Sequence, residues 1–312
     1  MIYTMTLHPA VDKTAIIPNF TPGRVNRITQ LTTEAGGKGI NVARAIYALG
    51  GECLALGIVG GDTGTWILEQ LDTSGIAHDF CRVSVPTRTN LKVVDPEQGQ
   101  TTDINEPGTT VPQDALEHVL HQALMRTNAG DMMVLSGSLP PGASIQGMKA
   151  WIAQLIQKGV RVCLDAEGGL LREWVGLEPF LIKPNQHEFA QLTGVSSADP
   201  ADIAAAVRDT CPPDTRAVVS LGADGAVYVG SEGIYMAQAL PVTVMSTVGA
   251  GDTLLAALAL GADRGWPVER ALRTAMAAAA LWVSRAPGTQ PDWRTLSDLA
   301  EQAAVTKIPL VI

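Results

Sequence analysis

A glycine-rich turn beside one acidic residue stands directly before an apolar segment with helical spacing. The sequence STVGAGDTLLAALAL fills residues 246–260, so Gly249, Ala250 and Gly251 immediately precede Asp252. A turn of this kind leaves backbone N–H groups unpaired at the start of a helix, where the helix dipole adds partial positive charge. Such a helix start can bind phosphate. A neighbouring carboxylate could then accept the proton of a hydroxyl that attacks a phosphoryl group.

A purely structural role for Asp252 is the ordinary alternative, because aspartate is favoured as the N-cap of a helix. A capping aspartate does not need Gly-Ala-Gly before it. Small residues allow a bulky ligand to approach the backbone closely. The pattern therefore favours phosphate chemistry at this helix start.

A second glycine-rich helix start lies about two hundred residues earlier, in GGKGINVAR at residues 36–44. It is not a phosphate-binding Walker A loop, because that motif requires Ser or Thr after the lysine and here Gly39 follows Lys38. It still places a cation and the amide of Asn41 at the start of a helix. The alternative is a tight turn with a solvated lysine.

Polar residues also follow several predicted strands. In open parallel sheets, ligands bind at the carboxyl ends of the strands. Any one polar strand end is ordinary in such a fold, but together they indicate one site. The candidates are Asp12, the Ser136-Gly-Ser138 run, Asp165, the run from Lys183 through Asn185 to Glu188, and the run from Ser220 to Gly222.

The elements that must position these residues alternate along the chain. Short apolar segments predict strands at 2–7, 53–59, 131–137, 160–166, 179–185 and 216–222. Amphipathic segments between them, such as 113–127 and 144–158, predict helices. From about residue 250 the pattern is helical except at the last few residues. This alternation predicts an α/β fold with a mostly parallel sheet covered by helices.

Two early segments interrupt this alternation. Residues 10–34 and 87–106 alternate apolar and polar side chains and carry turn signals at Pro22-Gly23 and near Gln98-Gly99. They predict two antiparallel hairpins. We expect these hairpins to form a small separate sheet that serves as a lid.

Composition limits the classes of protein that fit. The chain has 312 residues, of which 46% are hydrophobic and 17% charged, and its net charge is −9. We expect one domain over 1–312, and neither a nucleic-acid partner nor a membrane, because binding to such polyanions relies on a basic surface. A small anionic substrate remains possible. The start has no signal-peptide pattern, and Cys53, Cys81, Cys163 and Cys211 form no CxxC pair, so we expect a reduced, cytoplasmic protein.

The chain resembles the PfkB (ribokinase-like) carbohydrate kinases over nearly its full length. Within that family it is most similar to the phosphosugar branch of 1-phosphofructokinase, tagatose-6-phosphate kinase and the minor bacterial 6-phosphofructokinase. Seven motifs in family order carry the resemblance: TLHPAVD (6–12), GGKGINVAR (36–44), TRTNLKV (87–93), SGSLPPG (136–142), KPNQHE (183–188), VSLGADGA (219–226) and STVGAGD (246–252). The resemblance implies a three-layer α/β/α sandwich with a β-sheet lid.

The resemblance also implies roles for individual residues. Asp252 would be the catalytic base, and the turn of Gly249, Ala250 and Gly251 would form an anion hole with the amide of Asp252. Residues expected to bind substrate are Asp12, Gly37 and Asn41 near the sugar, with Lys38, Arg88 and Ser138 on the phosphate that the sugar already carries. Residues expected to bind ATP are Lys183, Asn185, Ser220, Gly222 and Gly225. Asn185 and Glu188 would hold Mg²⁺ indirectly, through water or phosphate.

The implied reaction is ATP-dependent phosphorylation of a ketohexose monophosphate to a bisphosphate, by a homodimer joined through the lids. Lys38 in GGKG and the NEPG run at 105–108 favour fructose 1-phosphate, while tagatose 6-phosphate and fructose 6-phosphate remain alternatives. A kinase of an unphosphorylated sugar or nucleoside and a non-catalytic sugar-phosphate sensor are further alternatives. Relatives often carry Asn where this chain has His8, which we interpret as packed and neutral rather than catalytic. We interpret His187 as a residue that lies on the surface or faces the helix.

Overall fold

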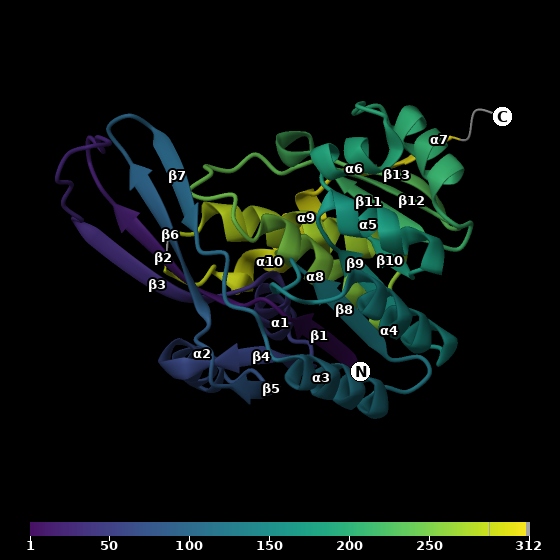
Figure 1. Cartoon of the computed structure of the whole chain (residues 1–312). Helices are drawn as coiled ribbons and strands as arrows, with labels where there is room; N and C mark the ends of the chain where they lie inside the picture. The colour runs from purple at the N-terminus through teal and green to yellow at the C-terminus, as the bar shows by residue number, and fades with distance from the viewer. Residues whose placement is uncertain (287, 310–312) are drawn as a thin grey trace.

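The computed structural model of the chain describes residues 1–286 and 288–309. A large α/β body carries a small four-stranded sheet, the lid, that projects from one side (Figure 1). Seven neighbouring strands of the central sheet are parallel. In spatial order they are β11 (Arg216–Ser220), β10 (Leu181–Ile182), β9 (Arg161–Asp165), β8 (Met132–Ser136), β1 (Ile2–Thr6), β4 (Cys53–Gly60) and β5 (His78–Val83). Each of the six predicted strand segments overlaps one of these strands; five contain the whole strand, and β4 extends one residue beyond the predicted 53–59.

Three antiparallel strands extend the sheet beyond β11 to a total of ten strands. They are β12 (Ala226–Gly230), β13 (Gly233–Ala237) and β14 (Val305–Ile308). The apolar runs of the sequence predict neither these strands nor β5. The short turn between β12 and β13 leaves no room for a crossover helix, so this edge must be antiparallel. The mostly parallel sheet is confirmed.

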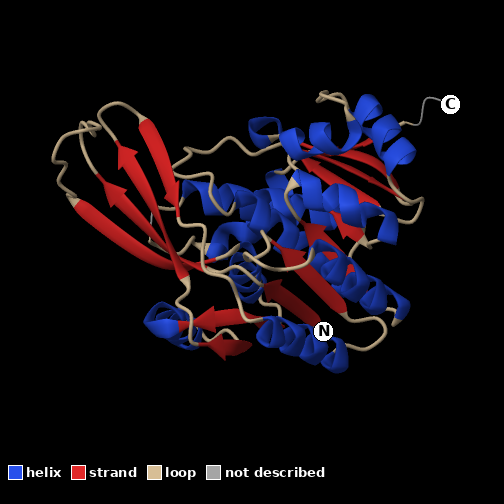
Figure 2. Ribbon diagram, viewed as in Figure 1, coloured by secondary structure: helices blue, strands red, loops and turns tan. Residues whose placement is uncertain are grey.

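Helices cover both faces of the sheet and make three layers, as Figure 2 shows. One face packs against α1 (Lys38–Ala48), α2 (Gly61–Thr73), α8 (Ala250–Asp263), α9 (Val268–Ser284) and α10 (Leu296–Gln302). The other packs against α3 (Gln113–Arg126), α4 (Ile145–Gln157), α5 (Gly168–Trp174), α6 (Gln186–Thr193) and α7 (Pro200–Thr210). Short 3₁₀ turns lie at Val175–Leu177, Gly222–Asp224 and Trp293–Thr295.

The apolar strands are apolar throughout because both of their faces are buried. In β8, Met132 and Val134 belong to the core on one side of the sheet, while Met133 and Leu135 belong to the core on the other. Successive side chains of a strand point to opposite faces, so a two-sided core requires apolar residues at every position. Cys163 of β9 is one of these buried residues, and Cys53 of β4 is another.

The lid is a four-stranded sheet in the order β3-β2-β6-β7. Its strands are β2 (Ala10–Ile16), β3 (Gln30–Gly36), β6 (Arg88–Asp95) and β7 (Gln100–Asn105). Both predicted hairpins are confirmed, since β2 pairs antiparallel with β3 and β6 with β7. Parallel pairing of β2 with β6 joins the two hairpins into one sheet. Its own core is small, with Ala15, Ile17 and Val93 buried.

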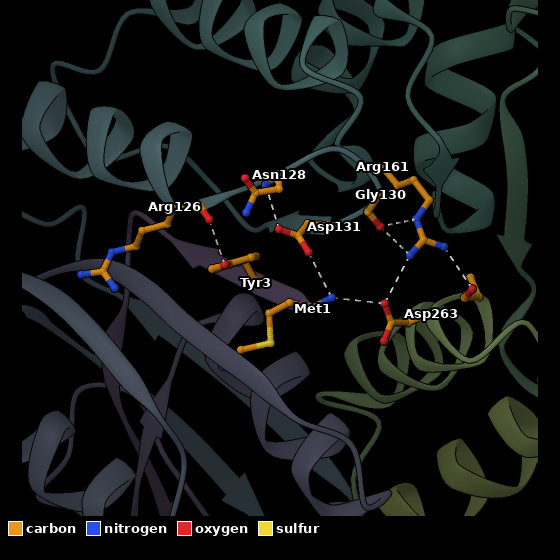
Figure 3. A network of polar contacts seen from close by, with 9 residues as sticks. Met1, Tyr3, Arg126, Asn128, Gly130, Asp131, Arg161 and Asp263 are labelled. Carbon is orange, nitrogen blue, oxygen red and sulfur yellow. Dashed lines mark hydrogen bonds and ion pairs between the residues drawn. The ribbon is translucent and has the colours of Figure 1, made fainter.

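A network of polar contacts closes the amino-terminal edge of the parallel strands (Figure 3). The ammonium group of Met1 lies 3.2 Å from Asp131 and 3.6 Å from Asp263. Arg161 bridges from Asp263, at 3.2 Å, to the carbonyl of Gly130. Partly exposed ion pairs of this kind contribute modestly to stability. The network lies at the edge opposite to the carboxyl ends of the strands, where the sequence places the candidate site.

Among the helices of the described residues, none is both long enough and apolar enough to cross a membrane.

Candidate active site

A cavity of about 970 Å³ lies between the carboxyl ends of the central strands and the lid. This is the edge at which parallel sheets bind ligands. Most of the predicted site residues line it: Asp12, Gly37, Lys38, Asn41, Arg88, Ser138, Lys183, Asn185, Glu188, Ser220, Gly249, Gly251 and Asp252. Residues far apart in the sequence therefore meet in one site, as predicted from the strand ends.

The start of α8 is built around Gly249, the residue before the helix. Gly249 has φ 83°, and a Cβ at this position would lie 2.5 Å from Nε1 of Trp282, so only glycine fits here. The amide of Ala250 donates to the carbonyl of Thr247 at 3.2 Å. The amides of Gly251 and Asp252 form no hydrogen bond within the described part of the chain. These two amides are thus the ones available to an anion at the helix start.

Asp252 is not the N-cap of α8, because the helix begins at Ala250 and Gly249 occupies the cap position. The capping alternative is therefore wrong. The Asp252 carboxylate is buried, and its Oδ2 accepts a hydrogen bond of 2.8 Å from the side-chain amide of Asn41. Burial, together with the nearby charge of Asp165, raises the pKa of Asp252 to about 6. A carboxyl with that pKa can act as a base at neutral pH.

Asp165 connects two lysines beneath this helix start. Its Oδ1 lies 3.3 Å from Nζ of Lys38 and 3.5 Å from Nζ of Lys183, and its Oδ2 accepts from the hydroxyl of Ser136 at 3.2 Å. Burial alone would raise the pKa of Asp165, but the two lysines outweigh it and lower that pKa. Asp165 therefore stays ionised and holds both cations beside Asp252. The sequence marked Asp165 only as a polar strand end and gave it no role.

The two lysines consequently have defined positions. Burial alone would lower the pKa of Lys38, but Asp165 and Asp252 raise it, so Lys38 is charged. Nζ of Lys183 is buried, and a Cβ on Gly251 would lie 3.1 Å from it. Lys183 is thus next to the free amide of Gly251. Two cations and two amides surround one position at the start of α8, an arrangement suited to a transferring phosphoryl group.

Asp12 projects from the lid strand β2 into the cavity. Its Oδ1 accepts a hydrogen bond of 2.9 Å from the side-chain amide of Asn90. A Cβ on Gly36 would lie 1.9 Å from Oδ2, so the carboxylate takes the space that a side chain would need. Gly37 has φ 121° and lies against Thr6 and Pro9. Burial raises the pKa of Asp12. The oxygen atoms of its carboxylate are hydrogen-bond acceptors, and they are placed to meet hydroxyl donors.

Arg88 lies at the start of β6, next to His8 and Ser138. Its guanidinium donates to the carbonyl of Glu106 at 3.1 Å and to the carbonyl of His8 at 3.4 Å. Nδ1 of His8 lies 3.0 Å from the hydroxyl of Ser138. Burial and the charge of Arg88 lower the pKa of His8 to about 4. His8 is therefore neutral at physiological pH, as the sequence analysis expected, but it is hydrogen-bonded to a cavity residue.

Asn185 and Glu188 form a reciprocal hydrogen-bonded pair at the start of α6. The Asn185 side chain accepts from the amide of Glu188 at 2.8 Å, and Oε2 of Glu188 accepts from the amide of Asn185 at 2.9 Å. Both side chains also line the cavity, where their oxygen atoms can accept further hydrogen bonds. No cluster of three metal-binding side chains occurs in the described residues. That donor set fits Mg²⁺ held mainly by water and phosphate.

The remaining nucleotide residues lie less centrally. Ser220 lines the cavity at the end of β11, whereas Gly222 and Gly225 form the turn into β12 and are not among the lining residues. A Cβ on Gly225 would lie 2.0 Å from the carbonyl of Ala237, which accounts for the glycine structurally. Their predicted contact with ATP remains a prediction. His187 is exposed and contacts Gln191, as predicted.

Comparison with known proteins decides the family. The model of the pfkB family carbohydrate kinases matches residues 5–296. The 1-phosphofructokinase of Vibrio cholerae is 32% identical over 98% of this chain and 97% of its own, and the ATP-dependent 6-phosphofructokinase isozyme 2 of Escherichia coli is 33% identical over 89% and 90%. The crystal structure of phosphofructokinase-2 from Escherichia coli in complex with substrates and products superposes with a TM-score of 0.90, at 30% identity over 96% of this chain and 98% of that one.

The chain belongs to the pfkB family of carbohydrate kinases. The resemblance inferred from the seven motifs is confirmed, and so is the ribokinase-like α/β fold with its small antiparallel sheet. A carbohydrate kinase of this family uses ATP.

The kinase also has a link between the lid and the turn before α8 that the sequence did not suggest. Arg285 lies 3.5 Å from Glu34 of β3, and its guanidinium stacks 4.0 Å above the ring of Trp282. Nε1 of Trp282 donates to the carbonyl of Val248 at 2.7 Å. The base of the lid is thus connected to the residues that shape the anion hole. Only the placing of Trp282 in the last turn of α9 and of Arg285 directly after that helix could have hinted at it.

Proposed function

We propose that this kinase transfers the γ-phosphoryl group of ATP to a ketohexose monophosphate, and that fructose 1-phosphate is the substrate. The observation that carries the proposal is the buried Asp252, with its pKa raised to about 6, beside the two free amides at the start of α8. A base next to an anion site serves phosphoryl transfer, and neither feature is needed for structure.

In the proposed mechanism the sugar hydroxyl gives its proton to Asp252 as its oxygen attacks the γ-phosphorus in line. Asn41 orients the carboxylate through its hydrogen bond of 2.8 Å. The amides of Gly251 and Asp252, with Lys38 and Lys183, stabilise the charge on the transferring group. Asn185 and Glu188 would hold Mg²⁺ through water and phosphate, and the ion would neutralise phosphate charge when bound.

Cations on the lid side of the cavity support a phosphorylated sugar as the substrate. The chain has a net charge of −9, yet Arg88 lies at the cavity wall with Ser138 close by. Arginine suits the recognition of phosphate oxygens. Lys38, which pairs with Asp165 beneath the start of α8, adds a second positive charge to the same cavity. These groups argue against a kinase of free sugars or nucleosides, which would have no use for a phosphate clamp.

The choice among ketohexose phosphates rests on the sequence. Lys38 within GGKG and the NEPG run at 105–108 favour fructose 1-phosphate, as does the similarity to the Vibrio cholerae enzyme. Tagatose 6-phosphate and fructose 6-phosphate are the alternatives. A coupled assay of ADP release with these three sugar phosphates, fructose, tagatose and a nucleoside tests the choice. No ADP release with any of them would favour a non-catalytic sensor, against which the intact base and anion site argue.

The first expected result is a fall in kcat/KM at acid pH. Because the base must be ionised and its pKa is about 6, kcat/KM should be nearly constant above pH 7 and fall about tenfold per pH unit below pH 6. The sugar phosphate also titrates near pH 6. The titration curve of the sugar phosphate should be measured by phosphorus NMR, and kcat/KM should be corrected for it.

The variant Asp165→Asn distinguishes the titration of Asp252 from the titration of the sugar phosphate in this pH profile. Removing the like charge of Asp165 lowers the pKa of Asp252, so the acid limb should move to lower pH. The titration of the substrate cannot move. A limb that stays in place in the variant would assign it to a group other than Asp252.

We also propose a homodimer joined through the lids. Every residue of β7 is exposed, and Leu31 and Ile104 of the two edge strands are 50% and 52% exposed. A small sheet of this kind is rarely stable with apolar side chains left in water. Light scattering at micromolar concentration should give twice the chain mass of 32.8 kDa. Such an ATP-consuming kinase of sugar phosphates would act in the cytoplasm.

Substitution at the lid tests the interface itself. Ile104→Asp should shift the protein toward monomers, because it puts a charge into the proposed contact. Met125→Asp is the matched control, since Met125 is 64% exposed on α3, outside the lid. A monomeric wild type, or a lid variant that dimerises as well as the control, would contradict the lid interface.

A further inference from the structure

His8 lies where the chain passes from β1 into the lid, and its ring faces the cavity. Nδ1 lies 3.0 Å from Oγ of Ser138, a residue 130 positions away in the sequence. Nε2 is enclosed and forms no well-directed hydrogen bond within the described residues. A Cβ on Gly108 would lie 2.5 Å from Nε2, so the loop after β7 packs directly against the ring. The ring is therefore held in place, with Ser138 at Nδ1 and the carbonyl of Pro107 close to the ring.

The backbone of His8 contacts the other side of the proposed phosphate clamp. Its carbonyl accepts a hydrogen bond of 3.4 Å from the guanidinium of Arg88. One residue thus touches both Arg88 and Ser138, through its main chain and its side chain respectively. A substitution of the side chain removes the second contact and leaves the first.

We propose that His8 is a positioning residue, which orients the hydroxyl of Ser138 toward the phosphate that the sugar substrate already carries. This role rests on the proposed function. Phosphate oxygens only accept hydrogen bonds, so a bound phosphate selects one arrangement of protons. Nδ1–H of His8 donates to Oγ of Ser138, and Ser138 donates its own proton to the phosphate.

His8 acts here through hydrogen bonding and not through charge. Burial of the ring and the adjacent Arg88 lower its pKa to about 4, with a smaller opposing effect of the Pro107 carbonyl. At pH 7.5 the ring is neutral in the free protein. Its effect should therefore pass through Ser138 alone, which makes the proposal testable by a double-mutant cycle.

Two substitutions of similar size separate the hydrogen bond from packing. Asn keeps a hydrogen-bonding atom at the δ position, where Nδ1 of His8 stands, whereas Leu places only carbon there. His8→Leu should raise KM for the sugar phosphate by about 3–10-fold, the usual range for one hydrogen bond. The effect on KM for ATP and on kcat should be smaller than this. His8→Asn should restore KM to within about twofold of wild type, since the δ donor is retained.

The cycle is completed with Ser138→Ala and the double variant His8→Leu/Ser138→Ala. Once Ser138 has lost its hydroxyl, His8→Leu should change KM for the sugar phosphate no further. His118→Leu, an exposed histidine on α3, is the control for a general effect of losing a histidine. Additive losses in the cycle would overturn the proposal. Equal losses in His8→Asn and His8→Leu would overturn it too, because packing alone predicts that pattern.

Failure of this role and failure of the proposed function give different results. If wild type phosphorylates sugar phosphates but the cycle is additive, only the role of His8 is wrong. If wild type phosphorylates free sugars alone, the phosphate clamp does not exist, and both the proposed function and the role of His8 are wrong. Melting temperatures of the four proteins show whether His8→Leu is folded, and His8→Asn keeps the test valid if it is not.

Discussion

Replacing Asp252 by Asn is expected to lower kcat by roughly 10²–10⁴-fold, the usual contribution of a positioned general base. Asn keeps the size of the side chain and can still face Asn41, but it cannot accept a proton. Affinity for ATP should change little, because the free amides of Gly251 and Asp252 belong to the backbone. Single-turnover rates and nucleotide binding by calorimetry measure the two effects separately.

The variant Asp199→Asn is a matched control for this result. Asp199 is a true N-cap, whose side chain accepts from the amide of Ala201 at 2.7 Å at the start of α7. Asn also caps helices well, so activity and stability should stay near wild type. A kcat of Asp252→Asn as unaffected as that of Asp199→Asn would move the base to another residue. Loss of the acid limb below pH 6 in the remaining activity of Asp252→Asn would support the assignment.

The sequence predicted those parts of the fold that local patterns determine. Continuous apolar runs such as residues 131–137 identified strands buried on both faces, and period-two alternation identified both lid hairpins. The apolar run at 179–185 identified β10 but not its length of two residues, and the four residues of β14 are too few to show a recognisable period. The antiparallel edge depends on a short turn after Gly230, whose effect is visible only once the strands are paired.

The candidate site was predictable where chemistry follows a motif and unpredictable where it depends on tertiary contacts. Asp252 and the glycines before it are contiguous, so a role for them could be proposed from the sequence. The ion pairs of Asp165 join it to Lys38, 127 residues away, and to Lys183, and no spacing rule connects these positions. The same holds for His8 and Ser138. The Asn185 and Glu188 pair is a local pattern, but it predicts a helix start as readily as a magnesium site.

Replacing Arg88 by Ala is expected to raise KM for the sugar phosphate by about 10–100-fold, because a charge-assisted hydrogen bond contributes about 1.5–3 kcal/mol. KM for ATP should stay nearly unchanged, since Arg88 lies with His8 and Ser138 on the lid side of the cavity. We expect the same rise in KM for Lys38→Ala. Lys38 also pairs with Asp165 beside Asp252, so this variant should lose kcat as well.

Free fructose and tagatose decide whether these cations form a clamp. Such sugars present no phosphate to Arg88, so any weak activity on them should be equal in wild type and Arg88→Ala. Arg208→Ala serves as the control, because Arg208 is an exposed cation on α7, outside the lid, and does not line the cavity. If Arg88 were only a solvated cation, none of these constants would change. If Arg88→Ala weakened free and phosphorylated sugars equally, the clamp would be wrong, and a kinase of unphosphorylated sugars would become the better interpretation of the cavity.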